Sequence, residues 1–222
     1  MTAAPARVVV LISGGGSNLQ ALIDARDAGT LPADLCAVIS NRADARGLAR
    51  AREAGIAAEV LDHQAYPSRE AYDTALRQRI EAHGAGLVVL AGFMRILSDG
   101  LVEHFRGRML NIHPSLLPAH RGLHTHRRVL EAGESQHGCS VHFVTPALDA
   151  GPVIAQGAVA VRPGDTADAL AARVQVQEHR IYPLVVRWFA EGRLELAGER
   201  VILDGRPMAA PLRLHAGEPL PA

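Results

Sequence analysis

The stretch Met109-Leu110-Asn111-Ile112-His113-Pro114-Ser115-Leu116-Leu117-Pro118 places polar side chains inside an apolar strand. Side chains alternate between the two faces of a strand, so Asn111 and His113 project from the same face, about 7 Å apart along it. Pro114 cannot donate to a β-ladder, so the strand is expected to end beside His113. Open α/β sheets bind ligands at the carboxyl ends of their strands. The pattern therefore predicts that both side chains lie at a ligand-binding edge.

An amide beside an imidazole offers what acyl transfer needs. Asn111 can donate a hydrogen bond to an oxyanion, and His113 can deliver or accept a proton. The alternative is that both are hydrogen-bonded polar groups at the end of a strand and have no chemical role.

Outward from this stretch, short apolar runs alternate with helical segments. Strands are expected at 8–12, 35–40, 56–61, 87–91, 109–113, 138–144 and 153–161, and helices from Asn18 and over 44–54, 68–83, 99–105, 127–132 and 167–190. This alternation predicts an α/β fold: a doubly wound, mostly parallel, Rossmann-like sheet with helices on both faces. A terminal hairpin is expected at 194–196 and 201–203, followed by a proline-rich tail at 207–222 that is expected to be flexible.

A glycine-rich turn, Ser13-Gly14-Gly15-Gly16-Ser17-Asn18, directly follows the first apolar run. Glycines let backbone N–H groups approach a phosphate, and the helix that follows favours its charge. The dinucleotide fingerprint is absent, because Leu19 replaces its third glycine and the second strand ends in Ser40-Asn41 without a ribose-binding acid. The turn therefore predicts a site for a single phosphate, as on a phosphosugar. The alternative is a tight turn that binds nothing.

Composition excludes several function classes. The 23 basic and 23 acidic residues balance, so no global field favours nucleic acid or an acidic membrane surface, and neither is expected as a partner. All basic residues are arginine; the absence of lysine excludes a Walker A lysine, a Schiff base and pyridoxal phosphate attachment. Two isolated cysteines fit a reducing compartment, and no apolar run reaches 18 residues, so a cytoplasmic, soluble protein is expected.

Four further features have both a functional and a structural interpretation. The loop Gly92-Phe93-Met94-Arg95-Ile96-Leu97 could line a flat heterocycle or belong to the core. Arg69 could reach an anionic ligand tail, and Glu178 could accept hydrogen bonds from sugar hydroxyls, or both could be solvated. Asp149 lies in a turn, Leu148-Asp149-Ala150-Gly151-Pro152, where aspartate is common, but this turn follows a strand that could lie beside the one carrying His113.

Metal binding is disfavoured. His124 and His126 alternate, but no carboxylate or cysteine accompanies them at a recognised ligand spacing.

Taken in order, these motifs, together with Gly122-Leu123-His124-Thr125-His126 and Gln177-Glu178-His179, closely resemble the phosphoribosylglycinamide formyltransferase branch of the folate-dependent formyltransferase superfamily. The resemblance runs from about Arg7 to Asp204. It implies one formyltransferase domain at 1–206, with a phosphosugar-binding half at 7–106 and a catalytic and folate-binding half at 107–206. It also implies formyl transfer from 10-formyltetrahydrofolate, the cosubstrate, to the amine of glycinamide ribonucleotide in de novo purine synthesis, without a metal.

The resemblance also implies roles for individual residues. The substrate would be held by Gly14, Gly15, Gly16, Ser17, Asn18 and Glu178, with Glu178 at the ribose. The folate would be contacted by Met94, Arg95, Ile96, Leu97 and Asn111, with Arg69 near it. Asn111 and His113 would stabilise the oxyanion of a tetrahedral intermediate. Asp149 would keep His113 protonated and oriented, because a neighbouring negative charge favours the imidazolium.

Two positions depart from the family pattern. Gly15 stands where relatives often carry a side chain, and Ala119-His120-Arg121 replaces an aromatic-proline step. An arginine at position 121 resembles the pattern of methionyl-tRNA formyltransferases. Those enzymes carry an additional carboxyl-terminal domain, which this chain is expected to be too short to hold. Formyltetrahydrofolate hydrolase and a non-catalytic phosphosugar- or folate-binding module are the remaining alternatives. A monomer and a homodimer are equally compatible with the sequence.

Overall fold

The computed structural model describes residues 5–221, which form two compact units divided between Asn111 and Ile112. The boundary falls inside β5 (Met109–His113), and the functional halves expected at 7–106 and 107–206 remain a prediction. The first four residues, which the sequence analysis places before the first strand, and residue 222 of the expected tail lie outside the described range.

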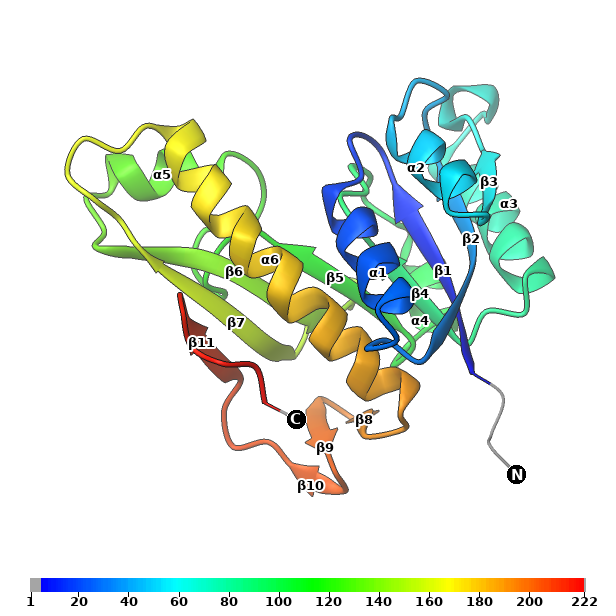
Figure 1. The fold of residues 1–222 in the computed structure, drawn as a ribbon. Coiled ribbons are helices and arrows are strands. Elements are labelled where there is room, and N and C mark those ends of the chain that lie inside the picture. Colours follow the sequence, from blue (N-terminus) through cyan, green and yellow to red (C-terminus); the bar gives the residue numbers. More distant parts are fainter. Residues whose placement is uncertain (1–4, 222) are drawn as a thin grey trace. The chain divides into compact units, whose positions relative to one another are not determined.

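In the first unit, β5 and four further strands form an entirely parallel sheet. The four are β1 (Ala6–Ile12), β2 (Ala33–Ser40), β3 (Ala57–Val60) and β4 (Leu87–Leu90), and the order is β3-β2-β1-β4-β5 (Figure 1). Val8 to Ile12 are completely buried, as expected for the unbroken apolar run of a strand covered on both faces. Strand order reverses between β1 and β4, the place where doubly wound sheets bind ligands.

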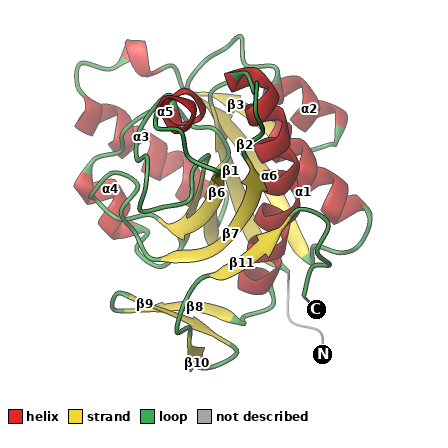
Figure 2. Ribbon diagram, turned by 90° about the vertical axis from the view of Figure 1, so that its left-hand side faces the viewer, coloured by secondary structure: helices red, strands yellow, loops and turns green. Residues whose placement is uncertain are grey.

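Helices cover both faces of this sheet, as predicted. Figure 2 shows α1 (Ser17–Asp27) and α2 (Gly47–Glu53) on one face and α3 (Arg69–Ala82) and α4 (Asp99–His104) on the other. A short 3-10 turn, η1 (His63–Ala65), follows β3. The helix expected at 68–83 begins where its cap predicts, because the Ser68 hydroxyl accepts a hydrogen bond from the Ala71 N–H at 3.1 Å.

The helix expected from Asp44 begins three residues later, at Gly47. Asp44 instead binds the Arg42 guanidinium at 2.7 Å, an exposed ion pair that lowers the pKa of the Asp44 carboxyl mainly through that hydrogen bond. The Gly47 N–H donates to the Gly14 carbonyl at 3.0 Å, so the start of α2 is set by the glycine-rich turn rather than by local propensity.

The second unit is built on an antiparallel pair, β6 (Gln136–Phe143) and β7 (Val153–Ala160). The long helix α6 (Ala167–Ala190) packs against both strands (Figure 1), and the Thr166 hydroxyl caps it by accepting from the Ala169 N–H at 3.1 Å. The buried side of α6 includes Tyr182 and Trp188. A second helix, α5 (Thr125–Glu131), contacts α6.

The predicted terminal hairpin is confirmed. It consists of β8 (Leu194–Ala197) and β9 (Arg200–Leu203), which are antiparallel, and β10 (Arg206–Pro207) adds a short third strand. Arg193 and Asp204 flank the hairpin and form two hydrogen bonds of 2.7 and 3.0 Å.

The prediction of a flexible tail at 207–222 is wrong for residues 212–215, which form a strand. Residues Leu212–His215 form β11, which pairs in parallel with β7, and Leu214 is buried. Arg187 donates to the Pro221 carbonyl at 3.1 Å and Arg213 to the Gln136 side chain at 2.8 Å. The segment is ordered because a distant strand edge and two arginines satisfy its backbone and side-chain polar groups.

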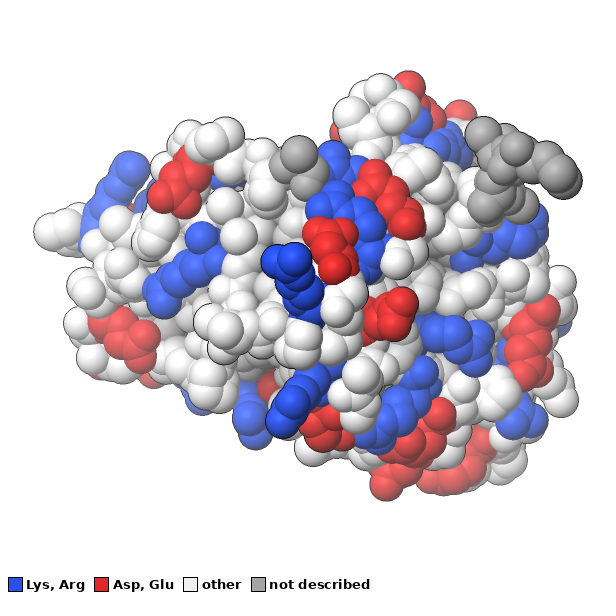
Figure 3. Space-filling model, turned by 90° about the horizontal axis from the view of Figure 1, so that it is seen from below, with Lys and Arg blue, Asp and Glu red and all other residues white. Residues whose placement is uncertain are grey.

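The surface carries both signs of charge. Figure 3 shows arginine and acidic side chains interspersed on the face it presents. Within residues 5–221, none of the helices has the length and apolar character needed to span a bilayer.

Candidate active site

The first unit presents two loops at the point where its strand order reverses. The glycine-rich turn leaves the carboxyl end of β1, and the loop 92–98 leaves the carboxyl end of the neighbouring strand β4. The backbone N–H of Ser13 donates to the Gly92 carbonyl at 3.1 Å, so the two loops are joined at their bases. This is the position at which α/β sheets of this type hold ligands.

The glycine-rich turn directs its carbonyl oxygens toward the protein. The Gly14 oxygen accepts from the Gly47 N–H at 3.0 Å, and the Gly15 oxygen accepts from the Arg50 guanidinium at 3.0 Å. The carbonyl and N–H of one trans peptide unit point in opposite directions, so the N–H groups of Gly15 and Gly16 face away from α2. A turn with outward N–H groups at the start of a helix is suited to an anion.

Gly16 is required by this geometry. Its φ of 72° lies in the left-handed region, and a Cβ there would stand 2.7 Å from the Gly47 Cα. A side chain is excluded at Gly16 because the left-handed φ would strain the backbone of any other residue. In addition, its Cβ would clash with backbone atoms of Gly47.

The loop after β4 exposes apolar side chains. Met94 is 69% exposed and Ile96 is 58% exposed, whereas Phe93 and Leu97 are buried. The sequence left open whether this loop lines a ligand or belongs to the core; its side chains alternate between the two environments.

Contacts with α3 hold the far end of this loop. The Arg95 guanidinium lies over the Tyr72 ring, 4.9 Å from its centroid, and the Ser98 N–H donates to an Asp73 carboxylate oxygen at 2.5 Å. Tyr72 is completely buried, and this burial raises the pKa of its hydroxyl well above the usual value.

Two predicted binding residues lie on helices. Arg69 is the first residue of α3, and its exposed side chain contacts Glu70 at 3.4 Å. Glu178 lies half-buried on α6, and its charge adds to the effect of burial in raising the pKa of the Cys139 thiol on β6. Their ligand roles remain predictions.

In the second unit, His113 and Asp149 lie in contact, as the resemblance implied. His113 Nδ1 is 3.4 Å from Asp149 Oδ2, and both side chains are about 8% exposed. Nε2 of His113 donates to the His120 carbonyl at 3.0 Å. Both ring nitrogens thus face oxygen atoms, and these two contacts fix the orientation of the ring.

The position of Asp149 is fixed by its backbone and by Gly122. Its φ is 47°, a left-handed conformation that aspartate tolerates better than most residues. The Gly122 N–H donates to Asp149 Oδ2 at 2.9 Å. The carboxylate is therefore held by the turn predicted from sequence and is also directed at the histidine.

The turn after His113 is held by a buried polar network. The Ser140 hydroxyl donates to the Ser115 carbonyl at 2.7 Å and accepts from the Leu117 N–H at 3.0 Å. Gln156 donates to the Leu117 carbonyl at 2.9 Å. Because Ser140 and Gln156 come from β6 and β7, the sheet fixes the backbone that follows His113.

His142 is a further residue near Asp149 that the sequence did not single out. Its Nε2 is 3.9 Å from Asp149 Oδ1, and its Nδ1 donates to the Phe143 carbonyl at 2.8 Å. Burial lowers the pKa of His142. The signal available in the sequence was that His142 lies near the end of the strand that precedes the Asp149 turn.

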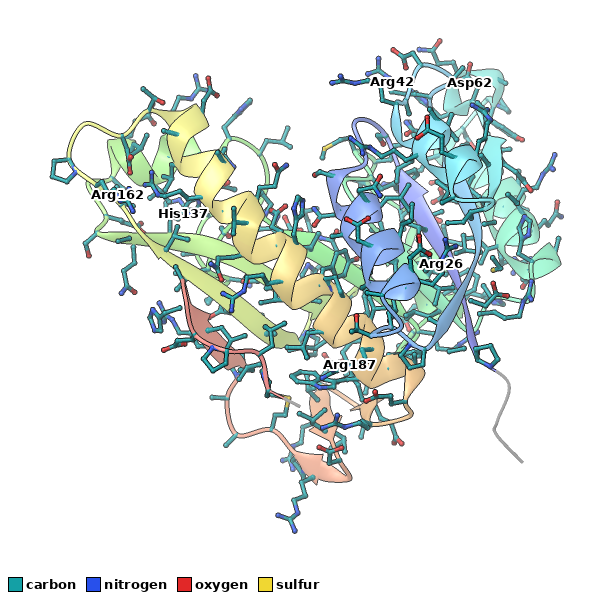
Figure 4. All side chains as sticks on the ribbon, in the orientation of Figure 1. Arg26, Arg42, Asp62, His137, Arg162 and Arg187 are labelled. Carbon is teal, nitrogen blue, oxygen red and sulfur yellow. The ribbon has the colours of Figure 1, made fainter. Side chains whose placement is uncertain are left out.

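His126 pairs with another histidine. Its Nδ1 lies 2.9 Å from His137 Nε2, so one ring donates to the other (His137 is labelled in Figure 4). Among residues 5–221, no group of three or more His, Cys, Asp or Glu residues is arranged to hold a metal ion.

His137 is expected to make the protein less stable in acid. Burial and the neighbouring His126, His120 and His113 lower its pKa from 6.5 to about 4. The folded protein keeps this ring neutral while the unfolded chain takes up a proton, so stability is lost as pH falls from about 6.5 toward 4. Between pH 7.5 and 5 the loss from this group should be about 2 kcal/mol.

Urea denaturation of the parent and of His137→Gln at both pH values measures this effect. The variant should lose less stability on acidification, whereas His215→Gln, which changes an exposed histidine, should behave as the parent. Equal acid sensitivity in the parent and His137→Gln would contradict the assignment.

The predicted site residues divide between the units. The first holds Gly14, Gly15, Gly16, Ser17, Asn18, Arg69, Met94, Arg95, Ile96, Leu97 and Asn111. The second holds His113, Asp149 and Glu178. Asn111 and His113 remain alternate residues of the single strand β5.

Comparison with known proteins identifies the family. A sequence model described as formyl transferase matches residues 6–186. The phosphoribosylglycinamide formyltransferase of Escherichia coli (strain K12) is 58% identical over 199 residues, covering 90% of this chain and 94% of that protein. The Haemophilus influenzae protein of the same name is 44% identical, with 91% and 95% covered. The structure of the Coxiella burnetii phosphoribosylglycinamide formyltransferase is 50% identical, with a TM-score of 0.91, covering 95% of this chain and 99% of that one. The chain therefore belongs to the formyl transferase family, among the phosphoribosylglycinamide formyltransferases.

Proposed function

We propose that this enzyme transfers a formyl group from 10-formyltetrahydrofolate to the amine of N1-(5-phosphoribosyl)glycinamide in de novo purine (IMP) biosynthesis. The observation that carries the mechanism is the 3.4 Å contact between His113 and Asp149; His113 lies two residues after Asn111 on β5. Asn111 supplies a hydrogen-bond donor to the oxyanion, His113 supplies a proton donor, and Asp149 orients His113.

In the proposed reaction the substrate amine is the nucleophile. Its nitrogen bonds to the formyl carbon, and the formyl oxygen takes on negative charge. The bond from that carbon to the folate nitrogen then breaks; the folate nitrogen gains a proton and the new amide nitrogen loses one. The side-chain N–H of Asn111 and the imidazolium of His113 would stabilise the negative charge on this oxygen. No enzyme nucleophile or metal takes part.

Asp149 orients His113 in this mechanism. Its carboxylate meets Nδ1, which leaves Nε2–H as the group that can act on substrate. In the structure Nε2 donates to the His120 carbonyl. During the reaction His113 Nε2–H has to leave the His120 carbonyl and donate to a substrate atom instead. The position of the His120 carbonyl shows the direction in which His113 can donate.

The binding roles follow the local geometry. The turn at Gly14, Gly15, Gly16, Ser17 and Asn18 would take the substrate phosphate, with the outward N–H groups of Gly15 and Gly16 directed at it. The exposed Met94 and Ile96 in the Met94 to Leu97 segment would contact the pterin, with Arg69 on the folate side. Glu178 would accept hydrogen bonds from the ribose.

We propose that the reaction takes place in the cytoplasm. Cys36 and Cys139 are both free thiols, which fits a reducing compartment.

A formyl-transfer assay tests the function. The enzyme is mixed with 10-formyltetrahydrofolate, with and without glycinamide ribonucleotide, and both formylated ribonucleotide and free formate are measured. Formylated product that requires the ribonucleotide is expected. Formate released at the same rate in both tubes would identify a hydrolase, and binding of both compounds without either product would identify a non-catalytic module.

A further inference from the structure

Ser13 is the first residue of the glycine-rich turn, at the switch point of the first unit. It directly precedes Gly14, and its side chain is buried, with 7% of the residue exposed. Its hydroxyl oxygen accepts a hydrogen bond from the Met94 N–H at 2.8 Å, which ties the loop 92–97 to the end of β1. The same hydroxyl donates its proton to Asn41 Oδ1 at 2.5 Å.

Asn41 gives the Ser13 hydroxyl a defined direction. A hydroxyl has one proton and two lone pairs, so once the proton is bound to Asn41 a lone pair can face Met94. Asn41 follows β2, is 4% exposed, and has its carbonyl 3.1 Å from Nδ1 of His63. The chain of contacts from Met94 through Ser13 to Asn41 therefore crosses the carboxyl ends of β4, β1 and β2.

Beyond Asn41 the surface is hollowed. A hollow of about 530 Å3 is lined by Asn41, Arg42, Ala43, Asp44, Asp62, His63 and Gln64. Two of these lining residues, Arg42 and Asp62, are labelled in Figure 4. Asn41 is thus held from one side by His63 and holds Ser13 on the other.

We propose that Ser13, oriented by Asn41, is a positioning residue for the cosubstrate loop 92–97. The inference rests on the proposed function, in which this loop contacts the pterin. The exposed side chains of Met94 and Ile96 can act as a fixed surface only if their backbone is fixed. The Met94 N–H is held by Ser13, and the far end of the loop is held by Asp73 and Tyr72.

The expected effect is selective for one ligand. Ser13→Ala leaves the Met94 N–H without its acceptor, so affinity for 10-formyltetrahydrofolate should fall roughly tenfold. Affinity for glycinamide ribonucleotide should change less than about twofold, because the outward N–H groups of the glycine-rich turn are backbone groups and remain in place.

Four variants and two ligands test the proposal. Calorimetry with 10-formyltetrahydrofolate alone and with glycinamide ribonucleotide alone is applied to the parent, Ser13→Ala, Asn41→Ala, the double variant and Ser40→Ala. Ser40 is the matched control: it is buried at the end of β2, and its hydroxyl binds the Arg42 carbonyl at 2.8 Å instead of the loop.

Ser13→Ala and Asn41→Ala should each weaken folate binding, and the double variant should be no weaker than the worse of the two, because the two residues act as one unit. Ser40→Ala should match the parent. Unchanged folate affinity in Ser13→Ala, additive losses in the double variant, or equal losses for both ligands would overturn the positioning role. A parent protein that binds no folate would overturn the proposed function, and this inference with it.

Hydrogen exchange in the parent tests the same contact without a substitution. The Met94 amide should be protected, because it is bonded to a buried hydroxyl. Exchange at the rate of an unprotected loop amide would overturn the proposal even if a variant failed to fold.

Discussion

Replacing Asp149 with asparagine is expected to lower turnover by about a hundredfold near neutral pH while leaving substrate affinities within about threefold. The asparagine can keep the left-handed backbone, since φ at this position is 47° and Asn adopts such angles readily. It can also accept from the Gly122 N–H, which now binds Asp149 at 2.9 Å. What it removes is the negative charge 3.4 Å from His113.

The expected loss of turnover in Asp149→Asn arises at His113. The asparagine oxygen that accepts from the Gly122 N–H also faces His113 Nδ1, but it is a neutral amide oxygen and no longer supplies the negative charge that supports a protonated ring during the reaction. Steady-state kinetics gives turnover, and calorimetry gives both dissociation constants.

Asp165→Asn is the matched control. Asp165 is a turn aspartate in the same unit that accepts from the Arg162 N–H at 2.7 Å and pairs with Arg173. This control should keep normal turnover. Normal turnover in Asp149→Asn as well would reduce Asp149 to the capping role that aspartate commonly has in turns.

Replacing Gly16 with valine is expected to weaken glycinamide ribonucleotide binding by about a hundredfold or more and to change folate affinity much less. The Cβ would stand 2.7 Å from the Gly47 Cα, and φ of 72° is forbidden to a β-branched residue. The turn must therefore move, and the N–H groups that face the phosphate move with it.

Gly29→Val separates this effect from general strain. Gly29 has nearly the same φ, 71°, but a Cβ there meets no atom within 4 Å. Calorimetry with both ligands should show near-parent affinities in Gly29→Val. Equal loss of both ligands in a folded Gly16→Val protein would place the phosphate elsewhere.

The first unit was largely predictable because its signals are local. An unbroken apolar run followed by three glycines predicted β1, the turn and α1, and Ser68 predicted the start of α3. These elements depend on residues within a few positions of one another. The parallel sheet followed from their alternation.

The errors involve partners distant in the chain. The start of α2 depends on Gly47 contacting Gly14, and β11 depends on pairing with β7. The alternation of Leu212 and Leu214 was a weak strand signal that the neighbouring prolines obscured. No local pattern could reveal these contacts.

The candidate site was predictable to different degrees. Asn111 and His113 followed from strand alternation, whereas Asp149 was suggested only by its place after a strand that could lie beside that of His113 and by the resemblance to a family. His142, Ser13 and Asn41 were missed as contact residues, because a histidine, a serine or an asparagine at a strand end has many ordinary explanations.

The most direct test of the proposed chemistry is a single-turnover measurement of Asn111→Ala with both substrates saturating. If the Asn111 amide donates to the developing oxyanion, the rate of formyl transfer should fall roughly a hundredfold, on the order of 3 kcal/mol, while both dissociation constants stay close to those of the parent. An unchanged rate would contradict the assignment of the oxyanion to this side chain.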